Sequence, residues 1–194
     1  FSFSRVYAGV NFLKKKKVSF KNKIFFVNDS YNLPLPDSSI DIVTTCHSVE
    51  PNKKYATNII KELFRITKKK LILFEPDTNL VKKKDYQNRS LIKKRFEKHN
   101  YVKNIDVKLK KLKLKFDKME QEYNFNKLNP ASIYSIKKNS KSKNLSNFIN
   151  PYNKDDSDFL KEDEHILYST KTGDTFFKVN NIVIFNKNNI YIGT

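Results

Sequence analysis

The apolar residues of this chain fall into short runs and helical stripes. Runs rich in Ile, Val and Phe at residues 23–27, 40–45 and 71–74 predict short strands. Residues 52–67, between the second and third runs, repeat apolar side chains at helical spacing. A strand, a helix and a strand in this order predict a right-handed parallel βαβ unit, and therefore an α/β fold.

Further elements flank this unit, with helices predicted at 1–13, 86–98 and 102–112 and strands at 113–123 and 132–138. The two strands are joined by residues 124–130, so we expect a hairpin that closes the edge of the parallel sheet. The lysine runs 14–17 and 68–70 are typical of solvated surface turns.

The last third of the chain has a different character. Residues 137–158 are rich in Lys, Ser, Asn and Asp and lack periodicity, which is typical of a linker. Three short strands follow, at 166–168, 175–179 and 182–185, and Asn180-Asn181 is a candidate two-residue hairpin turn. We therefore expect a partial domain over 1–138, a linker over 139–160 and a small β-unit over 161–194 that is too short to be stable alone.

Charge suggests a nucleic-acid partner, but the residue types do not. The formal net charge is +19, yet only four of the 39 Lys and Arg residues are arginine. Nucleic-acid interfaces favour arginine for bidentate contacts. Lysine, asparagine and isoleucine are all plentiful, which is typical of an AT-rich coding sequence. We therefore do not expect nucleic acid to be the partner.

Composition also limits the other classes of site. The single cysteine, Cys46, excludes an internal disulfide framework and a Cys-cluster zinc site, so we expect no metal. The three glycines are too scattered for a glycine-rich nucleotide loop. No run is as long as a membrane span and no signal peptide opens the chain, so we expect a cytoplasmic protein without membrane contact. The chain opens at Phe1 and its only methionine is Met119, so we expect its natural start to lie upstream.

Two polar clusters mark the expected site. Asn28-Asp29-Ser30 follows the first predicted strand, and Cys46–Asn52 follows the second. Ligands of open α/β sheets bind at the carboxyl ends of strands, so we expect a pocket there. His47 is either a base or a group that orients the acceptor of a reaction, or it is a loop residue that bonds the backbone. Asp29 is either a ligand or a turn cap.

Several of these residues also carry a family resemblance. Several passages of the chain resemble the corresponding passages of class I S-adenosylmethionine-dependent methyltransferases. They are residues 28–43 (NDSYNLPLPDSSIDIV), 62–66 (ELFRI) before 71–76 (LILFEP), 95–101 (RFEKHNY), and Asn129-Pro130 with 135–138 (SIKK). The resemblance covers about residues 1–138. It implies a partial Rossmann-like methyltransferase sheet, taken from the family's strand order 3-2-1-4-5-7-6. The family's glycine-rich first motif and its first strands are missing, so the resemblance implies an N-terminally truncated fragment.

The resemblance also implies roles for individual residues. Asp29 would hydrogen-bond the adenine amino group of S-adenosylmethionine, within a turn shaped by Asn28 and Ser30. Phe1 and Ser2 would lie beside the cofactor after the second family strand. Thr45, Cys46 and His47 would line the pocket around the methyl donor, and Glu50 and Asn52 would face the acceptor. Among these residues, His47 is the candidate catalytic residue. The implied activity is methyl transfer to a small-molecule or sugar-like acceptor.

The tail resembles a second kind of domain. Residues 168–173 (YSTKTG) and 177–183 (FKVNNIV) are similar to a passage of the small zinc-ribbon-like domains found with some methyltransferases. The cysteines of those domains are absent here, so the resemblance implies a metal-free ribbon that packs against the rest or contacts a protein partner. Two alternative functions stay open: a non-catalytic methyltransferase remnant acting as a protein-interaction module, and an RNA-directed methyltransferase.

Overall fold

The computed structural model describes residues 3–21, 23–83, 89–120, 130–140, 147–153, 155, 157–185 and 191–192. The chain forms two compact units. The central unit is Asp37–Lys143, and the split unit combines Phe1–Pro36 with Asn144–Thr194. These units divide the chain differently from the three predicted parts, because the N-terminal segment groups with the C-terminal strands.

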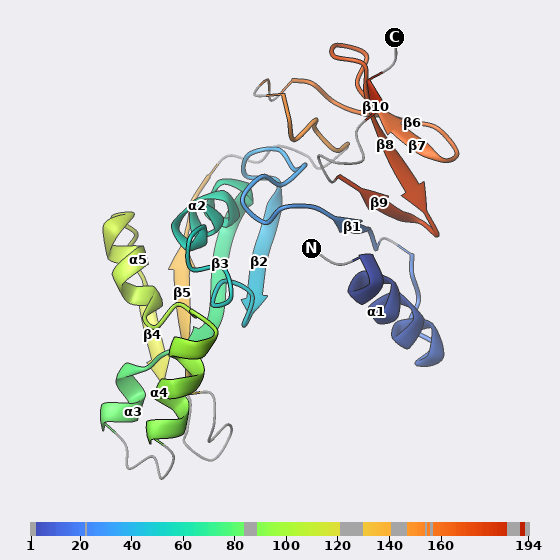
Figure 1. Ribbon diagram of the computed structural model, residues 1–194. Helices are drawn as coiled ribbons and strands as arrows, with labels where there is room; N and C mark the ends of the chain where they lie inside the picture. Colours follow the sequence, from blue (N-terminus) through green and yellow to red (C-terminus); the bar gives the residue numbers. More distant parts are fainter. Residues whose placement is uncertain are drawn as a thin grey trace. The chain divides into compact units, whose positions relative to one another are not determined.

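The central unit contains a four-stranded mixed sheet in the order β2-β3-β5-β4 (Figure 1). Its strands are β2 (Ile40–Cys46), β3 (Thr67–Pro76), β4 (Asp117–Glu120) and β5 (Ala131–Lys137). β2 and β3 are parallel and are joined through α2 (Ala56–Ile66), which confirms the predicted parallel strand–helix–strand order. β5 is antiparallel to both β3 and β4, so the predicted hairpin is also confirmed. Its connection, 121–129, lies outside the described residues.

The core of the central unit follows the hydrophobic pattern. α2 buries Ile59, Ile60, Leu63 and Ile66, and β3 buries Leu71 and Leu73. Three further helices are α3 (Asn79–Lys83), α4 (Arg89–Lys98) and α5 (Ile105–Lys111). α4 and α5 correspond to the two helices predicted after the third strand, whereas α3 has no counterpart among the predicted elements.

The lysine run 68–70 is not a turn. It extends β3, because Thr67 pairs with Ile40 and Lys70 pairs with both Ile42 and Lys137. The lysine stems can cross a sheet while their charges reach solvent, and Lys69 Nζ lies 2.9 Å from Asp41 Oδ1. This ion pair and that of Lys68 hold the pKa of the exposed Asp41 carboxyl below its usual value.

The split unit contains a second mixed sheet. Its path is β1-β9-β8-β7-β6, with β10 paired to β8. The strands are β1 (Phe25–Val27), β6 (Lys161–Glu162), β7 (Ile166–Tyr168), β8 (Asp174–Val179), β9 (Ile182–Ile184) and β10 (Tyr191–Ile192). Asn180 and Asn181 join β8 to β9 with φ angles of 50° and 61°, the left-handed conformation that a two-residue hairpin turn requires. The predicted hairpin is confirmed.

β1 connects the two sequence segments of the split unit. It is parallel to β9, with Phe25 opposite Ile182. The C-terminal β-unit therefore supplies the neighbouring strand of β1. α1 (Phe3–Lys15) contributes Val10 to a core cluster with Val27 and Ile182. The second cluster joins Leu160, Leu167, Phe176, Val183 and Phe185.

The described part of the predicted linker is folded into this unit. Ile149 and Phe159 form an antiparallel bridge, and Asn150 and Asp158 are fully buried. The polar composition of this segment therefore reflects a buried hydrogen-bond network rather than a flexible connection.

Candidate functional site

The first candidate site lies at the carboxyl ends of the parallel strands β2 and β3. Cys46 ends β2 and pairs with Phe74 of β3, and Glu75 follows Phe74. The backbone N–H of His47 donates to the carbonyl of Phe74 over 2.9 Å. His47 has a φ angle of 51°, a left-handed conformation that is uncommon for a non-glycine residue. The chain therefore turns sharply as it leaves β2.

Glu75 holds this turn. Its side chain is fully buried, and Oε1 accepts hydrogen bonds from Thr45 Oγ1 at 2.9 Å, Ser48 N at 3.0 Å and Val49 N at 3.1 Å. Oε2 accepts a fourth from Glu50 N at 3.2 Å. Three successive backbone N–H groups thus point at one carboxylate, which fixes the path of residues 48–50. Within the family resemblance, Glu75 has no role beyond its place in the passage 71–76. The available signal was an acid directly after an apolar strand.

Burial raises the pKa of Glu75 above its ordinary value of 4.5, and the four hydrogen bonds oppose that rise. The folded protein then keeps the Glu75 proton to a higher pH than the unfolded chain does. The free energy that this proton contributes is therefore fully present below about pH 4.5, and it declines as pH rises toward the folded pKa.

The raised pKa of Glu75 predicts that the stability of the protein depends on pH. The stability of the wild type relative to Glu75→Gln, which cannot titrate, should fall as pH rises above about 4.5 and level off once Glu75 is ionised in the fold as well. Urea unfolding of both proteins at several pH values measures the difference. A stability difference that rises over this range would mean that the pKa of Glu75 is lowered in the fold.

His47 and Glu50 form a side-chain pair in the same turn. His47 Nδ1 lies 2.8 Å from Glu50 Oε2, and the Glu50 residue is only 4% exposed. The edge of the His47 ring meets Phe74, with ring centroids 5.5 Å apart. The Glu50 carbonyl also accepts a hydrogen bond from Val102 N at 2.8 Å. Glu50, which the resemblance assigns to the acceptor, is therefore positioned to orient the imidazole.

The other residues assigned to this end of the sheet lie within the same loop. Thr45 uses its hydroxyl to bind Glu75, and Cys46 is an exposed free thiol. Asn52 Nδ2 donates to the Ser48 carbonyl at 3.0 Å, which closes the turn. The structure therefore brings Thr45, Cys46, His47, Glu50 and Asn52 together in the central unit.

The second candidate site is the turn after β1 in the split unit. The Asn28 side chain closes this turn, since Nδ2 donates to the Asn32 carbonyl at 2.5 Å and Oδ1 accepts from Asp29 N at 2.7 Å. Asp29 is partly exposed and Ser30 is exposed. Among the described residues, no hydrogen bond or ion pair reaches the Asp29 carboxylate. Asn28 thus shapes the turn, while the Asp29 carboxylate can accept hydrogen bonds from a ligand.

The remaining assignments are not tested by these contacts. Phe1 and Ser2 lie outside the described residues. Asn28, Asp29 and Ser30 belong to the split unit, and Thr45–Asn52 belong to the central unit. That these two groups line one pocket stays a prediction.

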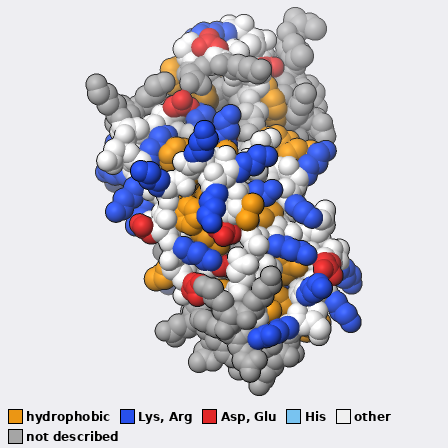
Figure 2. All heavy atoms as spheres, turned by 90° about the vertical axis from the view of Figure 1, so that its left-hand side faces the viewer, with side chains coloured by type: hydrophobic (Ala, Val, Ile, Leu, Met, Phe, Trp, Pro, Cys, Tyr) orange, Lys and Arg blue, Asp and Glu red, His pale blue; other side chains and the backbone are white. Residues whose placement is uncertain are grey.

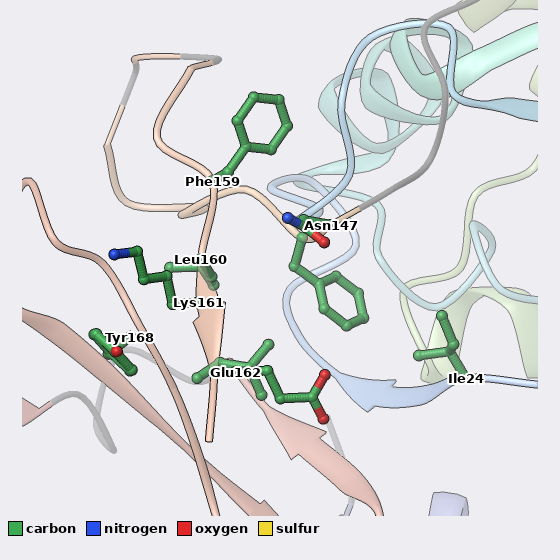
Figure 3. Close-up of a pocket in the computed structure, with 9 residues that line it drawn as sticks. Ile24, Asn147, Phe159, Leu160, Lys161, Glu162 and Tyr168 are labelled. Carbon is green, nitrogen blue, oxygen red and sulfur yellow. The ribbon is translucent and has the colours of Figure 1, made fainter. Parts of the chain in front are cut away.

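The split unit also contains a hollow of about 550 Å³, shown in Figure 3. Its lining combines apolar side chains with Lys161, Glu162 and Asn147; the apolar members are Ile24, Phe148, Phe159, Leu160 and Leu167. Tyr168 also lines it, and Lys178 Nζ binds Glu162 Oε1 at 2.5 Å. The polar groups in this hollow do not converge on one point as those around Glu75 do.

Other kinds of site find less support in the described residues. On the face seen in Figure 2, Lys and Arg are spread among apolar and acidic side chains rather than gathered into one stripe. Within the described ranges, no group of three His, Cys, Asp or Glu residues is arranged to hold a metal ion. The same ranges contain no helix with the length and apolar character needed to cross a membrane.

Comparison with known proteins finds a likeness among solved structures. No protein-family model matches the chain, and no curated protein matches it. Among solved structures, the chain is similar to a protein of Methanosarcina mazei described as a SAM-dependent methyltransferase. The two are 19% identical, with a TM-score of 0.43, and the match covers 60% of this chain and 68% of the other.

Proposed function

We propose that this chain takes part in S-adenosylmethionine-dependent methyl transfer and carries the reaction side of the site at the ends of β2 and β3. The observation that supports this most directly is the strand order β2-β3-β5-β4. The last strand of this sheet, β5, lies between β3 and β4, as strand seven lies between strands five and six in the methyltransferase order. β2 and β3 then correspond to the fourth and fifth family strands, whose carboxyl ends face the reaction.

His47 and Glu50 provide the proton chemistry of this proposal. When Nδ1–H donates to the buried Glu50 carboxylate, Nε2 becomes the accepting nitrogen of the neutral ring. A base at this place can take the proton of an acceptor hydroxyl or amine as it is methylated. Glu75 sets the geometry, because it fixes the backbone that carries both residues.

The side chains present fit part of the cofactor. In the split unit, the Asp29 carboxylate accepts no hydrogen bond within the described residues and suits an adenine amino group. In the central unit, Thr45 and Cys46 lie at the carboxyl end of β2. When bound, S-adenosylmethionine supplies a methyl group activated by its sulfonium, so that alignment does much of the catalytic work. No glycine-rich segment is present for its methionine end. We therefore expect binding near the millimolar range, about −4 kcal/mol.

A titration of the ¹⁵N-labelled chain with S-adenosylmethionine tests the proposal. Amide shifts should change at 28–32 and at 45–50, and Asp29→Ala should remove the response of the first group while the second persists. Asp117→Ala, an exposed carboxylate of β4, is the matched control and should leave both responses intact. An absence of shifts in both groups at 5 mM ligand, on the order of five times the expected dissociation constant, would overturn the proposal.

The His47–Glu50 pair makes a separate prediction. At pH 9, where histidine rings are neutral, ¹⁵N NMR should show His47 in the tautomer protonated at Nδ1, because Glu50 accepts that proton. Glu50→Ala should shift His47 away from this tautomer. His165, which is exposed beside Glu164, should not change and serves as the internal control. An Nε2-protonated His47 in the wild type would reject its role as a proton acceptor through that atom.

A further inference from the structure

The split unit contains a buried polar cluster. Asp158 is 1% exposed, Asn150 is fully buried and Ser169 is 2% exposed. Asp158 Oδ2 accepts from Asn150 Nδ2 at 3.0 Å and from Asn153 Nδ2 at 2.9 Å, and Oδ1 accepts from Ser169 Oγ at 2.7 Å. Asn150 Nδ2 also lies 3.0 Å from Thr172 Oγ1. Three side chains thus bind one buried carboxylate. Thr172 joins them only through Asn150, and both Thr172 Oγ1 and Asn150 Nδ2 also donate to Asp174 Oδ2 at 2.7 Å.

The spacing of these four residues is that of a metal ribbon. Asn150 and Asn153 are separated by two residues, fifteen residues follow, and Ser169 and Thr172 are again separated by two. Zinc ribbons place their four cysteines as C-x₂-C-x₁₅₋₂₀-C-x₂-C. Gly173, directly after the second pair, has a φ angle of 79°, so the chain turns there in a conformation that favours glycine.

The two pairs also share a local conformation. In each pair, the side-chain oxygen of the first residue accepts a backbone N–H from two residues further on. Asn150 Oδ1 accepts from Tyr152 N at 3.0 Å, and Ser169 Oγ accepts from Lys171 N at 3.1 Å. The two turns, far apart in sequence, therefore present their side chains to a common centre in the same way.

We propose that Asn150, Asn153, Ser169 and Thr172 occupy the four ligand positions of a metal ribbon, and that the Asp158 carboxylate takes the place of the metal. Donors from three of these positions converge on the Asp158 anion where thiolates would converge on a cation, and the fourth, Thr172, is linked to them through Asn150. The cross-link is therefore made by hydrogen bonds. We call these five residues the metal-free clasp.

The metal-free clasp supports the turn that carries Asp29. Asn32 Nδ2 donates to the Pro151 carbonyl at 2.5 Å, and Ile149 N donates to the Pro34 carbonyl at 3.1 Å. Pro151 and Ile149 flank Asn150, so the clasp fixes the segment on which this turn rests. The residues of the metal-free clasp are therefore positioning residues for Asp29. Only the role of Asp29 in binding S-adenosylmethionine rests on the proposed function.

The test converts the metal-free clasp into a metal site. In the full chain, the variant N150C/N153C/S169C/T172C should bind one Zn²⁺, and Co²⁺ should give the spectrum of a tetrahedral thiolate site. Without metal its melting temperature should drop by about 10 °C or more, and one equivalent of Zn²⁺ should restore most of that loss. N150C/N153C alone is the matched control and should not gain stability with Zn²⁺. The wild type should respond to neither Zn²⁺ nor chelator.

A milder variant keeps the proposal testable if the four-cysteine protein does not fold. Asp158→Asn should lower the melting temperature by about 5–15 °C and shift the amide NMR signals of residues 28–32. The new side-chain amide brings an N–H donor against groups that now donate to the carboxylate. Asp155→Asn, at a nearby exposed carboxylate paired with Lys171, should leave those amides unchanged.

Two outcomes would overturn the metal-free clasp: a folded four-cysteine variant without tetrahedral metal binding, or an Asp158→Asn protein that melts like the wild type. A different outcome would overturn the proposed function while leaving the metal-free clasp in place. If zinc rescues stability but S-adenosylmethionine shifts no amide in any form of the protein, the clasp stands and the cofactor role of the turn does not.

Discussion

Glu75→Ala should lower the free energy of unfolding of the central unit by about 3–5 kcal/mol. The substitution removes the single acceptor group that satisfies the backbone N–H groups of Ser48, Val49 and Glu50. These donors would remain beside a cavity in a buried turn, and each unsatisfied buried group costs about 1–3 kcal/mol. Urea unfolding followed by amide signals of β2 and β3 measures the loss for this unit alone.

Thr45→Val is the matched control, because it removes one hydrogen bond to the same carboxylate and keeps the side-chain shape. Its cost should be about 1 kcal/mol. If Glu75→Ala costs no more than Thr45→Val, the carboxylate does not organise the turn. The position of His47 would then need another explanation.

Phe176→Ala should destabilise the split unit by about 3–5 kcal/mol, the usual cost of removing a buried aromatic ring. Phe176 is fully buried, and its ring centroid lies 5.0 Å from that of Phe185 and 6.2 Å from that of Tyr152. The cavity would open between β8 and the segment that carries Asn150. Denaturant unfolding followed by amide signals of β8 and β9 measures the loss.

Phe177→Ala provides the comparison within the same strand. Successive side chains of a strand point to opposite faces, and Phe177 is 38% exposed. Its replacement should cost about 1 kcal/mol or less. Equal losses for the two substitutions would contradict the assigned faces of β8.

The local elements of this fold were predictable because their signals are contained in short windows. Strand, helix and strand over residues 40–76 follow from one apolar run, one helical stripe and a second apolar run. Asn180-Asn181 predicts its hairpin through the tolerance of asparagine for left-handed φ angles. The lysine run 68–70 misled the prediction, because pairing with strands on both sides outweighed its charge.

Long-range pairings gave no comparable signal. β1 pairs with β9, and no sequence pattern in either strand identifies the other as its partner. The loop after β2 was identified as a candidate site from its position at a strand end. The role of Glu75 was not identified, since it depends on backbone donors that come close only when β2 and β3 pair. Asp158 was assigned to a linker for the same reason.

The pairing of β1 with β9 also sets an order for folding. The central unit is continuous in sequence, so its contacts form over short loops, whereas Phe25 must find Ile182 across the whole central unit. Non-local pairing slows folding, and chains made on the ribosome fold their early segments first. During synthesis, α1 and the turn of Asp29 therefore keep their apolar surface exposed to solvent until β9 has left the ribosome. We expect chaperones to bind this exposed segment of the nascent protein.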